Sequence, residues 1–364
     1  MPATTRILYQ RPLVSLARST SARMWLVSLC AGLAVLQSAL TDSFSSLFIA
    51  LAAVAAALLS ELLVNRPLKL RTVQDGSAVA SALVLALLLP NQINPALAAL
   101  GAVFAMVVVK HSFGGLGTNW LNPAVAGWLF IRFSWPAAFD TALESSPLTV
   151  LSALLRSGAW DAGGSPLNIL TAGGGSFSVP AQTIATVLSS AVNTGYSALN
   201  HMILSFSGAE LSGDYLNLFI SGGPGIIADR GLFALLLGTI IITASQANRA
   251  WIPAVFLAVY TLLVRFFGAL PMGGALGNGD MIFGLCSGGV IAAAFLLVSD
   301  PATGPKSVIG AAAVAAATGL LAFFLRYAGI EPYGAFFAVA LMNTLIPRIR
   351  DFENRRVYMK GGRR

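Results

Sequence analysis

Apolar segments recur along the chain and alternate with short polar or proline-containing breaks. In the first half they cover residues 24–40, 47–64, 77–89, 96–110 and 122–133, and in the second half 231–247, 251–267, 281–298, 306–327 and 333–347. Several are shorter than the ~20 residues with which a helix crosses hydrocarbon. Broken helices at that depth are tolerated where they are buried among neighbours or line a cavity. The pattern predicts an all-α integral membrane protein with about ten transmembrane helices.

One stretch occurs twice, once in each half. Residues 77–95 (SAVASALVLALLLPNQINP) and 287–305 (SGGVIAAAFLLVSDPATGP) each run from a serine through an apolar segment to a proline-bounded break. Both span 18 positions from first serine to last proline (95 − 77 and 305 − 287). Short, interrupted hydrophobic segments at corresponding places in two halves are typical of transport folds, whose site lies where the helices break. An odd number of spans per half predicts two inverted five-helix repeats.

The pattern divides the chain into five parts. A basic amino-terminal stretch (1–23) precedes the first five-span repeat (24–133), and a large loop (134–230) leads to the second repeat (231–347) and a basic tail (348–364). Loops longer than about 15 residues usually have a function. We expect the loop to lie outside and to hold a cofactor or partner site, with a simple spacer as the alternative.

Composition excludes several classes of protein. Apolar residues make up 56% of the 364 residues and charged residues 10%, against about 25% charged residues in a soluble domain. The two cysteines (Cys30 and Cys286) and two histidines (His111 and His201) have no metal-ligand spacing. We therefore expect neither a metal site nor haem held by this chain's own ligands.

Basic residues give the expected orientation. With a cytoplasmic amino terminus, 17 of the 22 Lys and Arg fall inside, ten before the tail and seven within it. The ten are Arg6, Arg11, Arg18, Arg23, Arg66, Lys69, Arg71, Lys110, Arg249 and Lys306. This bias predicts that both termini lie in the cytoplasm. The net charge of +8 is then explained by contact with anionic lipid or a partner subunit, without nucleic acid.

Four strings, in order and well spaced, resemble one family. They are Asp75-Gly76-Ser77 leading into SALVLALLLP, LGTNWLNPAVAGW at 116–128, FLLVSDPATGP at 295–305 and AVALMNTLIPRI at 338–349. The chain is similar to the NqrB/RnfD proteins, which are membrane subunits of the sodium-pumping quinone reductase and of the Rnf electron-transport complex. Its length and single large loop look more like RnfD.

The resemblance implies a flavin-bearing subunit that passes electrons within a multi-subunit complex and couples their flow to ion movement. In the family an external threonine, in a pattern like S-x-A-T-P-L, holds FMN through a phosphoester bond, and some relatives bind a second flavin, riboflavin, within the membrane. Here Ser146 stands at the threonine's place. The serine hydroxyl can form the same phosphoester bond. Because serine replaces the family threonine, the sequence leaves open whether the flavin is attached to this chain or has been lost. Asp229 stands where relatives tend to have glutamate ahead of the sixth span, and it is a second candidate flavin contact.

Ionisable and polar groups at the helix breaks are candidates for the ion pathway. Asp75 beside Ser77, and Asp300 beside Thr303, lie at the ends of the repeated segments. The alternative is that Asp75 caps a helix and Asp300 shapes a turn. Two further candidates, Asn122 and Asn343, are also suited to hydrogen bonding between helices.

These observations predict a membrane subunit of an Rnf-type, redox-driven ion translocase. No GxGxxG or P-loop fingerprint is present, so NADH would be oxidised by a partner subunit, and no catalytic residue is assigned to this chain. A channel or permease for a small solute and a structural subunit that has lost its flavin remain as alternatives. The sequence leaves open which ion moves and which groups donate and accept electrons.

Overall fold

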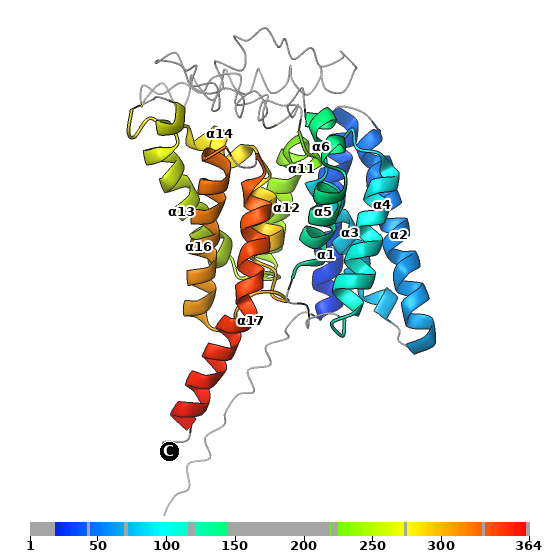
Figure 1. Ribbon diagram of the computed structural model, residues 1–364. Helices are drawn as coiled ribbons and strands as arrows, with labels where there is room; N and C mark the ends of the chain where they lie inside the picture. Colours follow the sequence, from blue (N-terminus) through cyan, green and yellow to red (C-terminus); the bar gives the residue numbers. More distant parts are fainter. Residues whose placement is uncertain are drawn as a thin grey trace, which may run out of the picture.

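The computed structural model describes residues 19–41, 44–68, 72–115, 119, 121–143, 219, 225–272, 275–329 and 332–361. Within these ranges the regular structure is helical, and no strand is formed apart from one isolated antiparallel bridge between Pro90 and Ile226. The helices stand side by side as one bundle (Figure 1). The expectation of a mostly helical protein is therefore confirmed.

The helices of the first half are α1 (Thr20–Thr41), α2 (Ser45–Leu68), η1 (Thr72–Asp75), α3 (Ser77–Leu88), α4 (Pro95–Phe104), the π-helix η2 (Ala105–His111), α5 (Pro123–Ser134) and α6 (Pro136–Leu143). Those of the second half are α11 (Ile227–Arg230), α12 (Leu232–Ala244), α13 (Trp251–Phe267), η5 (Leu270–Met272), α14 (Met281–Cys286), α15 (Val290–Ala292), the π-helix η6 (Ala293–Val298), α16 (Val308–Tyr327) and α17 (Gly334–Gly361).

Three of these helices are long and apolar enough to cross a membrane. They are Thr20–Thr41, Ser45–Asn65 and Val308–Tyr327, and four shorter apolar helices stand beside them. Leucine side chains on the outside of α1, and leucine and phenylalanine side chains on the outside of α2, are exposed, as expected of surfaces that face lipid chains.

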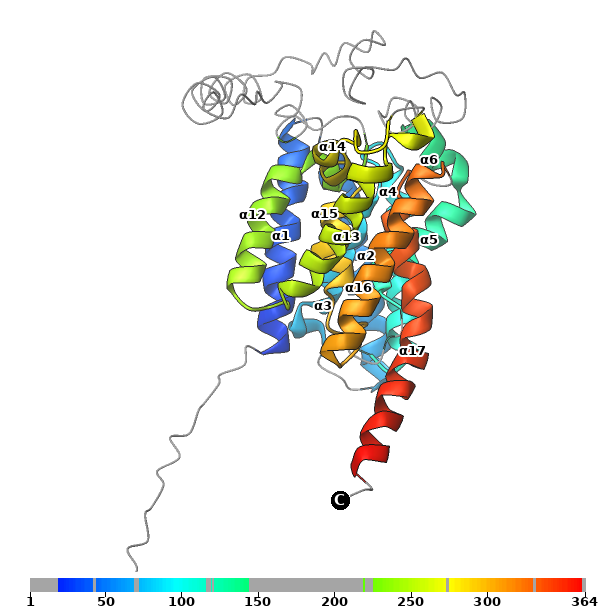
Figure 2. The same ribbon diagram turned by 90° about the vertical axis from the view of Figure 1, so that its left-hand side faces the viewer.

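Two ends of the bundle can be told apart (Figures 1 and 2). We call the end at which α1 begins and α17 projects the lower end, and the end that carries α6 and α14 the upper end. α1 runs upward from Thr20, packs against α3 of its own half and also contacts α12 of the other half. The first helix of the chain therefore joins the two halves.

Small residues allow the helices to approach closely. A Cβ placed on Gly238 would lie 2.8 Å from Cβ of Cys30, where α12 meets α1. A Cβ on Gly127 would lie 2.7 Å from the carbonyl oxygen of Gly101, where α5 meets α4. Such contacts leave no room for a side chain and are typical of helix packing in membranes.

Glycines mark the starts of the two short helices that the sequence repeat predicts. Gly76 has a φ of 75° immediately before α3, and Gly288 and Gly289 have φ values of 71° and 67° immediately before α15. Only glycine adopts this left-handed conformation without strain. The predicted span 281–298 is accordingly divided into α14, α15 and η6.

The last helix is longer than the pattern predicts. α17 runs from Gly334 to Gly361 and contains Pro347, so the boundary expected at residue 347 falls inside a continuous helix. Its lower part extends beyond the other helices (Figure 1). Proline lacks the N–H that would bond to the carbonyl oxygen of Asn343.

Candidate functional site

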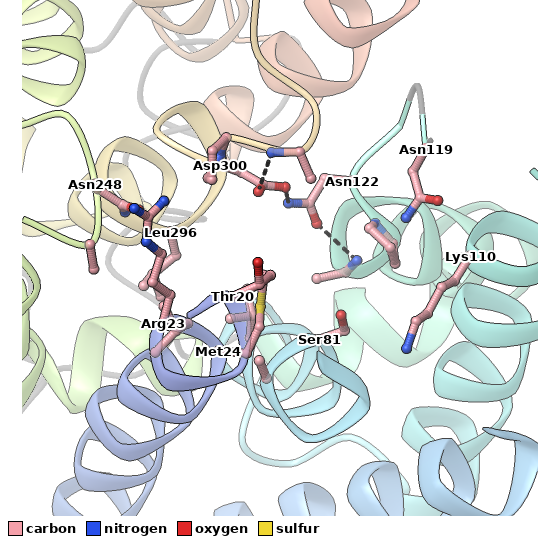
Figure 3. Close-up of a pocket in the computed structure, with 18 of the residues that line it drawn as sticks. Thr20, Arg23, Met24, Ser81, Lys110, Asn119, Asn122, Asn248, Leu296 and Asp300 are labelled. Atoms are coloured by element: carbon pink, nitrogen blue, oxygen red, sulfur yellow. Dashed lines mark hydrogen bonds between the residues drawn. The ribbon is translucent and has the colours of Figure 1, made fainter. Parts of the chain in front are cut away.

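A cavity of about 480 Å³, lined by both polar and apolar side chains, opens among the helices at the lower end. Its lining comes from both halves of the chain: α1, α3, η2 and the segment before α5 on one side, and the residues after α12, η6 and the turn after η6 on the other. Figure 3 shows Arg23 and Met24 reaching in from α1, with Asn122 opposite Asp300. Helix breaks from both halves therefore meet at one cavity.

Asp75 fixes the beginning of α3 beside this cavity. Its Oδ1 atom accepts the backbone N–H of Ser77 at 2.8 Å and also the Ser77 hydroxyl. The N-cap of α3 is Gly76 and not Asp75, and it forms no side-chain cap bond, so the alternative that Asp75 caps this helix is wrong. Asp75 instead shapes the turn that leads into α3 and also lines the cavity.

A buried lysine joins the start of α3 to two further elements, in a group that we call the Lys110 cluster (Glu61, Asp75, Ser77 and Lys110). Lys110 is 2% exposed, and its Nζ donates to Glu61 Oε1 at 2.8 Å and to Ser77 Oγ at 2.6 Å. Glu61 itself is fully buried. A charged pair inside a membrane protein is costly and usually functional, so this cluster belongs to the candidate site.

Asn122 connects the first half directly to the second. Its Oδ1 accepts the N–H of Ala124 and so caps α5, while its Nδ2 donates to Asp300 Oδ2 at 3.1 Å. Asp300 also accepts the N–H of Ala302 at 3.0 Å and the Thr303 hydroxyl at 3.4 Å. Asp300 lies in the turn between η6 and α16, outside the crossing helices, and burial raises the pKa of its carboxyl group.

Two polar groups in the lining have no hydrogen-bond partner within the described ranges. They are Oδ1 of Asn119, a residue that is 2% exposed, and Nε of Arg23. Buried polar atoms are nearly always paired in proteins, so such an atom indicates a place for a ligand or water. Nearby, Asn248 donates to the Phe295 carbonyl at 3.0 Å and to Ser299 Oγ at 2.8 Å.

A second buried cation lies toward the upper end, in what we call the Arg326 cluster (Asp229, Tyr260, Ser287 and Arg326). Arg326 Nη1 donates to Tyr260 Oη at 2.8 Å and to the carbonyl oxygens of Gly284 and Ser287, and Nη2 donates to Ser287 Oγ at 2.6 Å. Asp229 accepts the N–H groups of Gly288 at 3.0 Å and Gly289 at 2.8 Å. The cluster therefore holds the α14–α15 break together.

The predicted site residues fall into several groups. Asp75, Asn122 and Asp300 line the cavity, and Ser77 and Thr303 are bonded to two of them. Asn343 and Thr303 line a separate, very small cavity between η6 and α17. Asp229 belongs to the Arg326 cluster. Ser146 and most of the loop 134–230 lie outside the described residues. The side chain of Arg66, one of the basic residues expected on the cytoplasmic side, lies outside them as well.

Several residues of these groups were not predicted as site residues from the sequence, among them Lys110, Asn119, Asn248 and Arg326. From the sequence, Lys110 is expected to be one of the basic residues on the cytoplasmic side, whereas the structure buries it at the end of η2. A lysine directly after the apolar run AMVVV was the available signal. Asn119 stands three residues before Asn122 in an apolar context, which was a second signal.

The fold and the cavity define a class of protein: a helical membrane protein with several crossings, whose interrupted helices surround a cavity at one end. A sequence model of one family, described as the NQR2, RnfD, RnfE family, matches residues 7–359. The chain belongs to this family, as its four strings predicted.

Similar proteins match over most of their length. One subunit of a proton-translocating ferredoxin:NAD(+) oxidoreductase complex from Clostridium ljungdahlii is 29% identical over 345 residues, covering 94% of this chain and 92% of the relative. The corresponding subunit of a Na(+)-translocating ferredoxin:NAD(+) oxidoreductase complex from Acetobacterium woodii is 29% identical, covering 79% and 74%. That of an ion-translocating oxidoreductase complex from Shewanella amazonensis is 31% identical, covering 84% of each.

Proposed function

We propose that this chain is the flavin-bearing membrane subunit of an Rnf-type electron-transport complex and that it couples electron transfer to cation movement. The observation that carries the proposal is the lower cavity, where Asp75 from one half and Asp300 from the other line the same space. Its relatives are subunits of complexes that translocate protons or Na⁺, which supports other subunits of such a complex as partners.

The proposed arrangement has ten crossings in two inverted five-span halves within a bacterial inner membrane. The lower end then faces the cytoplasm and the loop 134–230 lies outside. Two observations support this: glycines with positive φ precede both short helices, and the charged part of α17 projects from the lower end. Basic residues are favoured on the cytoplasmic side of membrane proteins.

The lining of the lower cavity fits an uncharged flavin such as riboflavin. Val84, Phe295 and Leu296 offer apolar walls, and the unpaired amide oxygen of Asn119 offers an acceptor for a ring N–H. A cavity volume of about 480 Å³ lies within the usual range for sites of small ligands, roughly 300–1,000 Å³. A bound flavin would supply the capacity to hold electrons, while the protein supplies orientation and electrostatics.

The carboxylates of Asp75 and Asp300 provide the cation-binding part of the proposed coupling. Asp75 and Asp300 place negative charge at the rim of the cavity, where a cation gains attraction that it lacks in hydrocarbon. Asn122 joins Asp300 to the start of α5, so a change in charge at Asp300 acts on both halves. This linkage is the physical basis that we propose for coupling.

Covalent FMN on the external loop is the further part of the proposal, with Ser146 as the attachment residue. The chain is co-expressed with a flavin transferase, denatured, separated on a gel and examined for flavin fluorescence. We expect signal in the wild type and in the neighbouring control Ser145→Ala, and none in Ser146→Ala. Absence of signal from all three chains would contradict attachment and favour the flavin-free structural subunit.

A channel or permease for a small solute is the second candidate function, because a cavity with polar side chains at helix breaks suits conduction as well. Proteoliposomes that contain the whole complex distinguish the two. The redox proposal predicts cation uptake only when an electron donor is added. Uptake that proceeds at the same rate without a donor would support the permease and contradict the proposal.

A further inference from the structure

A second cavity at the lower end, of about 440 Å³, is strongly basic. It lies on the other side of the turn formed by Asp300, Pro301 and Ala302, which both cavities share. Four cationic side chains line it, each from a different segment: Arg23 from α1, Arg249 from the α12–α13 connection, Lys306 from the turn before α16 and Arg350 from α17. We call it the basic pocket.

These positive charges outnumber the acidic side chains in the pocket lining. Asp300 is the one carboxylate among the residues that line the pocket, and its oxygens are occupied by Ala302, Thr303 and Asn122. Within the described ranges no ion pair is formed by any of the four cations. Arg249 and Lys306 are exposed. Clustered arginine and lysine donors of this kind are suited to phosphate oxygens.

An acidic side chain outside the lining, Glu353, is already engaged. Glu353 on α17 accepts the backbone N–H of Lys306 at 3.2 Å and the hydroxyl of Ser307. Arg350, one helical turn earlier, donates to the carbonyl oxygens of Ala302 at 2.8 Å and Gly304 at 2.7 Å. The pocket wall is therefore fixed by hydrogen bonds before any ligand arrives.

Apolar side chains continue the pocket along α13 and α16. Ile252, Val298 and Val314 contribute to its lining. Val308 lies on the same face of α16 as Ala311 and Ala315, which line the pocket, and it is 64% exposed. A free phosphate ion would use the cations alone, whereas an amphiphile uses the cations and this apolar strip together.

We propose that the basic pocket binds the phosphodiester headgroup of an anionic phospholipid, with the acyl chains lying along α13 and α16. Basic pockets between helices at one membrane face bind such headgroups in other proteins. The lipid would brace the turn that carries Asp300. The proposal concerns a lipid site and does not depend on which electrons or ions the complex handles.

The test measures lipid binding to the purified, delipidated complex that contains the full chain. Native mass spectrometry gives the dissociation constants of phosphatidylglycerol and phosphatidylcholine for the wild type, Arg249→Gln and the double variant Arg249→Gln/Lys306→Gln. Both substituted residues are exposed, so the fold is retained. Arg265→Gln, at the upper end of the same helix α13, is the matched control.

Each removed cation should weaken phosphatidylglycerol binding about fivefold, and the double variant should weaken it about thirtyfold, from a contribution near 1 kcal/mol per basic residue. Arg265→Gln should bind as the wild type does. Unchanged phosphatidylglycerol affinity in the double variant would overturn the proposal, as would phosphatidylcholine binding with the same affinity and the same dependence on Arg249. Millimolar inorganic phosphate that displaces phosphatidylglycerol from the wild type would assign the site to free phosphate instead.

Discussion

The Lys110 and Arg326 clusters each hold the start of a short helix in place, at opposite ends of the bundle. In each, a buried cation near the end of a helix reaches a serine beside the start of a short helix that follows glycine: Ser77 for Lys110 and Ser287 for Arg326. The other partners differ. Lys110 forms an ion pair with Glu61, whereas Arg326 donates to the neutral oxygens of Tyr260, Gly284 and Ser287.

The surroundings of the two clusters differ as well. Asp75 and Lys110 line the lower cavity, while no member of the Arg326 cluster lines the lower cavity or the basic pocket. A cation whose donors are taken up by neutral oxygens is suited to holding a helix break in place. A charged pair beside a cavity can respond to a cation or a change of charge there. We therefore propose a functional task for the lower cluster and, beside the flavin contact expected of Asp229, a structural task for the upper one.

Arg326→Met should have the largest effect on stability. It removes four hydrogen bonds from buried groups and should lower the free energy of unfolding by about 4 kcal/mol, since buried acceptors are left unpaired. Reversible SDS titration of the purified chain measures this change. Arg265→Met, near the upper end of α13, is the control and should change stability by about 0.5 kcal/mol or less. A loss of the same size in both variants would contradict a special role for the Arg326 cluster.

Lys110→Met should come second. It removes one buried counter-charge of Glu61 and should cost about 3 kcal/mol of unfolding free energy. Adding Glu61→Gln in the same chain lowers the buried negative charge, so the double variant should be more stable than the single one. The same SDS titration tests this order. If the two substitutions were simply additive, the ion pair would not be the reason for the cost.

Asp229→Asn should cost about 2 kcal/mol, because an amide retains one acceptor for the two N–H groups of Gly288 and Gly289 while a charged acceptor is lost. The effect should appear in the unfolding free energy and leave electron-driven cation uptake per folded complex unchanged. If the variant kept full stability but lost cation uptake, Asp229 would have a functional role and not a structural one.

Asn122→Ala should have the smallest effect on stability, about 1 kcal/mol, the usual cost of losing a helix N-cap. It also removes the bond to Asp300, so its effect on cation uptake should exceed its effect on unfolding. Asn94→Ala is a matched control, because Asn94 caps α4 in the same way before a proline and does not line the lower cavity. Equal uptake in the two variants would contradict a role for the Asn122–Asp300 bond.

Much of the fold could be predicted from the sequence, because apolar runs indicate lipid-facing helices, and glycines and prolines indicate the positions where these helices break. The break at Gly288 and Gly289, and the starts of α4 and α5 at Asn-Pro pairs, follow from local chain chemistry. The continuation of α17 through Pro347 was not predicted, since a proline in a helix is tolerated when neighbouring helices compensate for the lost hydrogen bond.

The candidate site was predicted less completely. Asp75, Asn122 and Asp300 carry local signals, namely a position at the start of a helix or a turn before proline. The burial of Lys110 depends on α2 supplying Glu61, 49 positions earlier in the sequence, and no local pattern records that pairing. Long-range contacts of this kind arise from packing, which is why Arg326 and Asn248 were also missed.

Coupling through the lower cavity can be measured as electron-driven cation uptake by proteoliposomes that contain the whole complex, with Asp300→Asn compared with Asp280→Asn. Asp280 caps α14 at the upper end, where asparagine serves equally well. We expect Asp300→Asn to lower uptake about tenfold or more, the size expected from losing one charged acceptor, while Asp280→Asn keeps the wild-type rate. Wild-type uptake by Asp300→Asn would contradict coupling through this carboxylate.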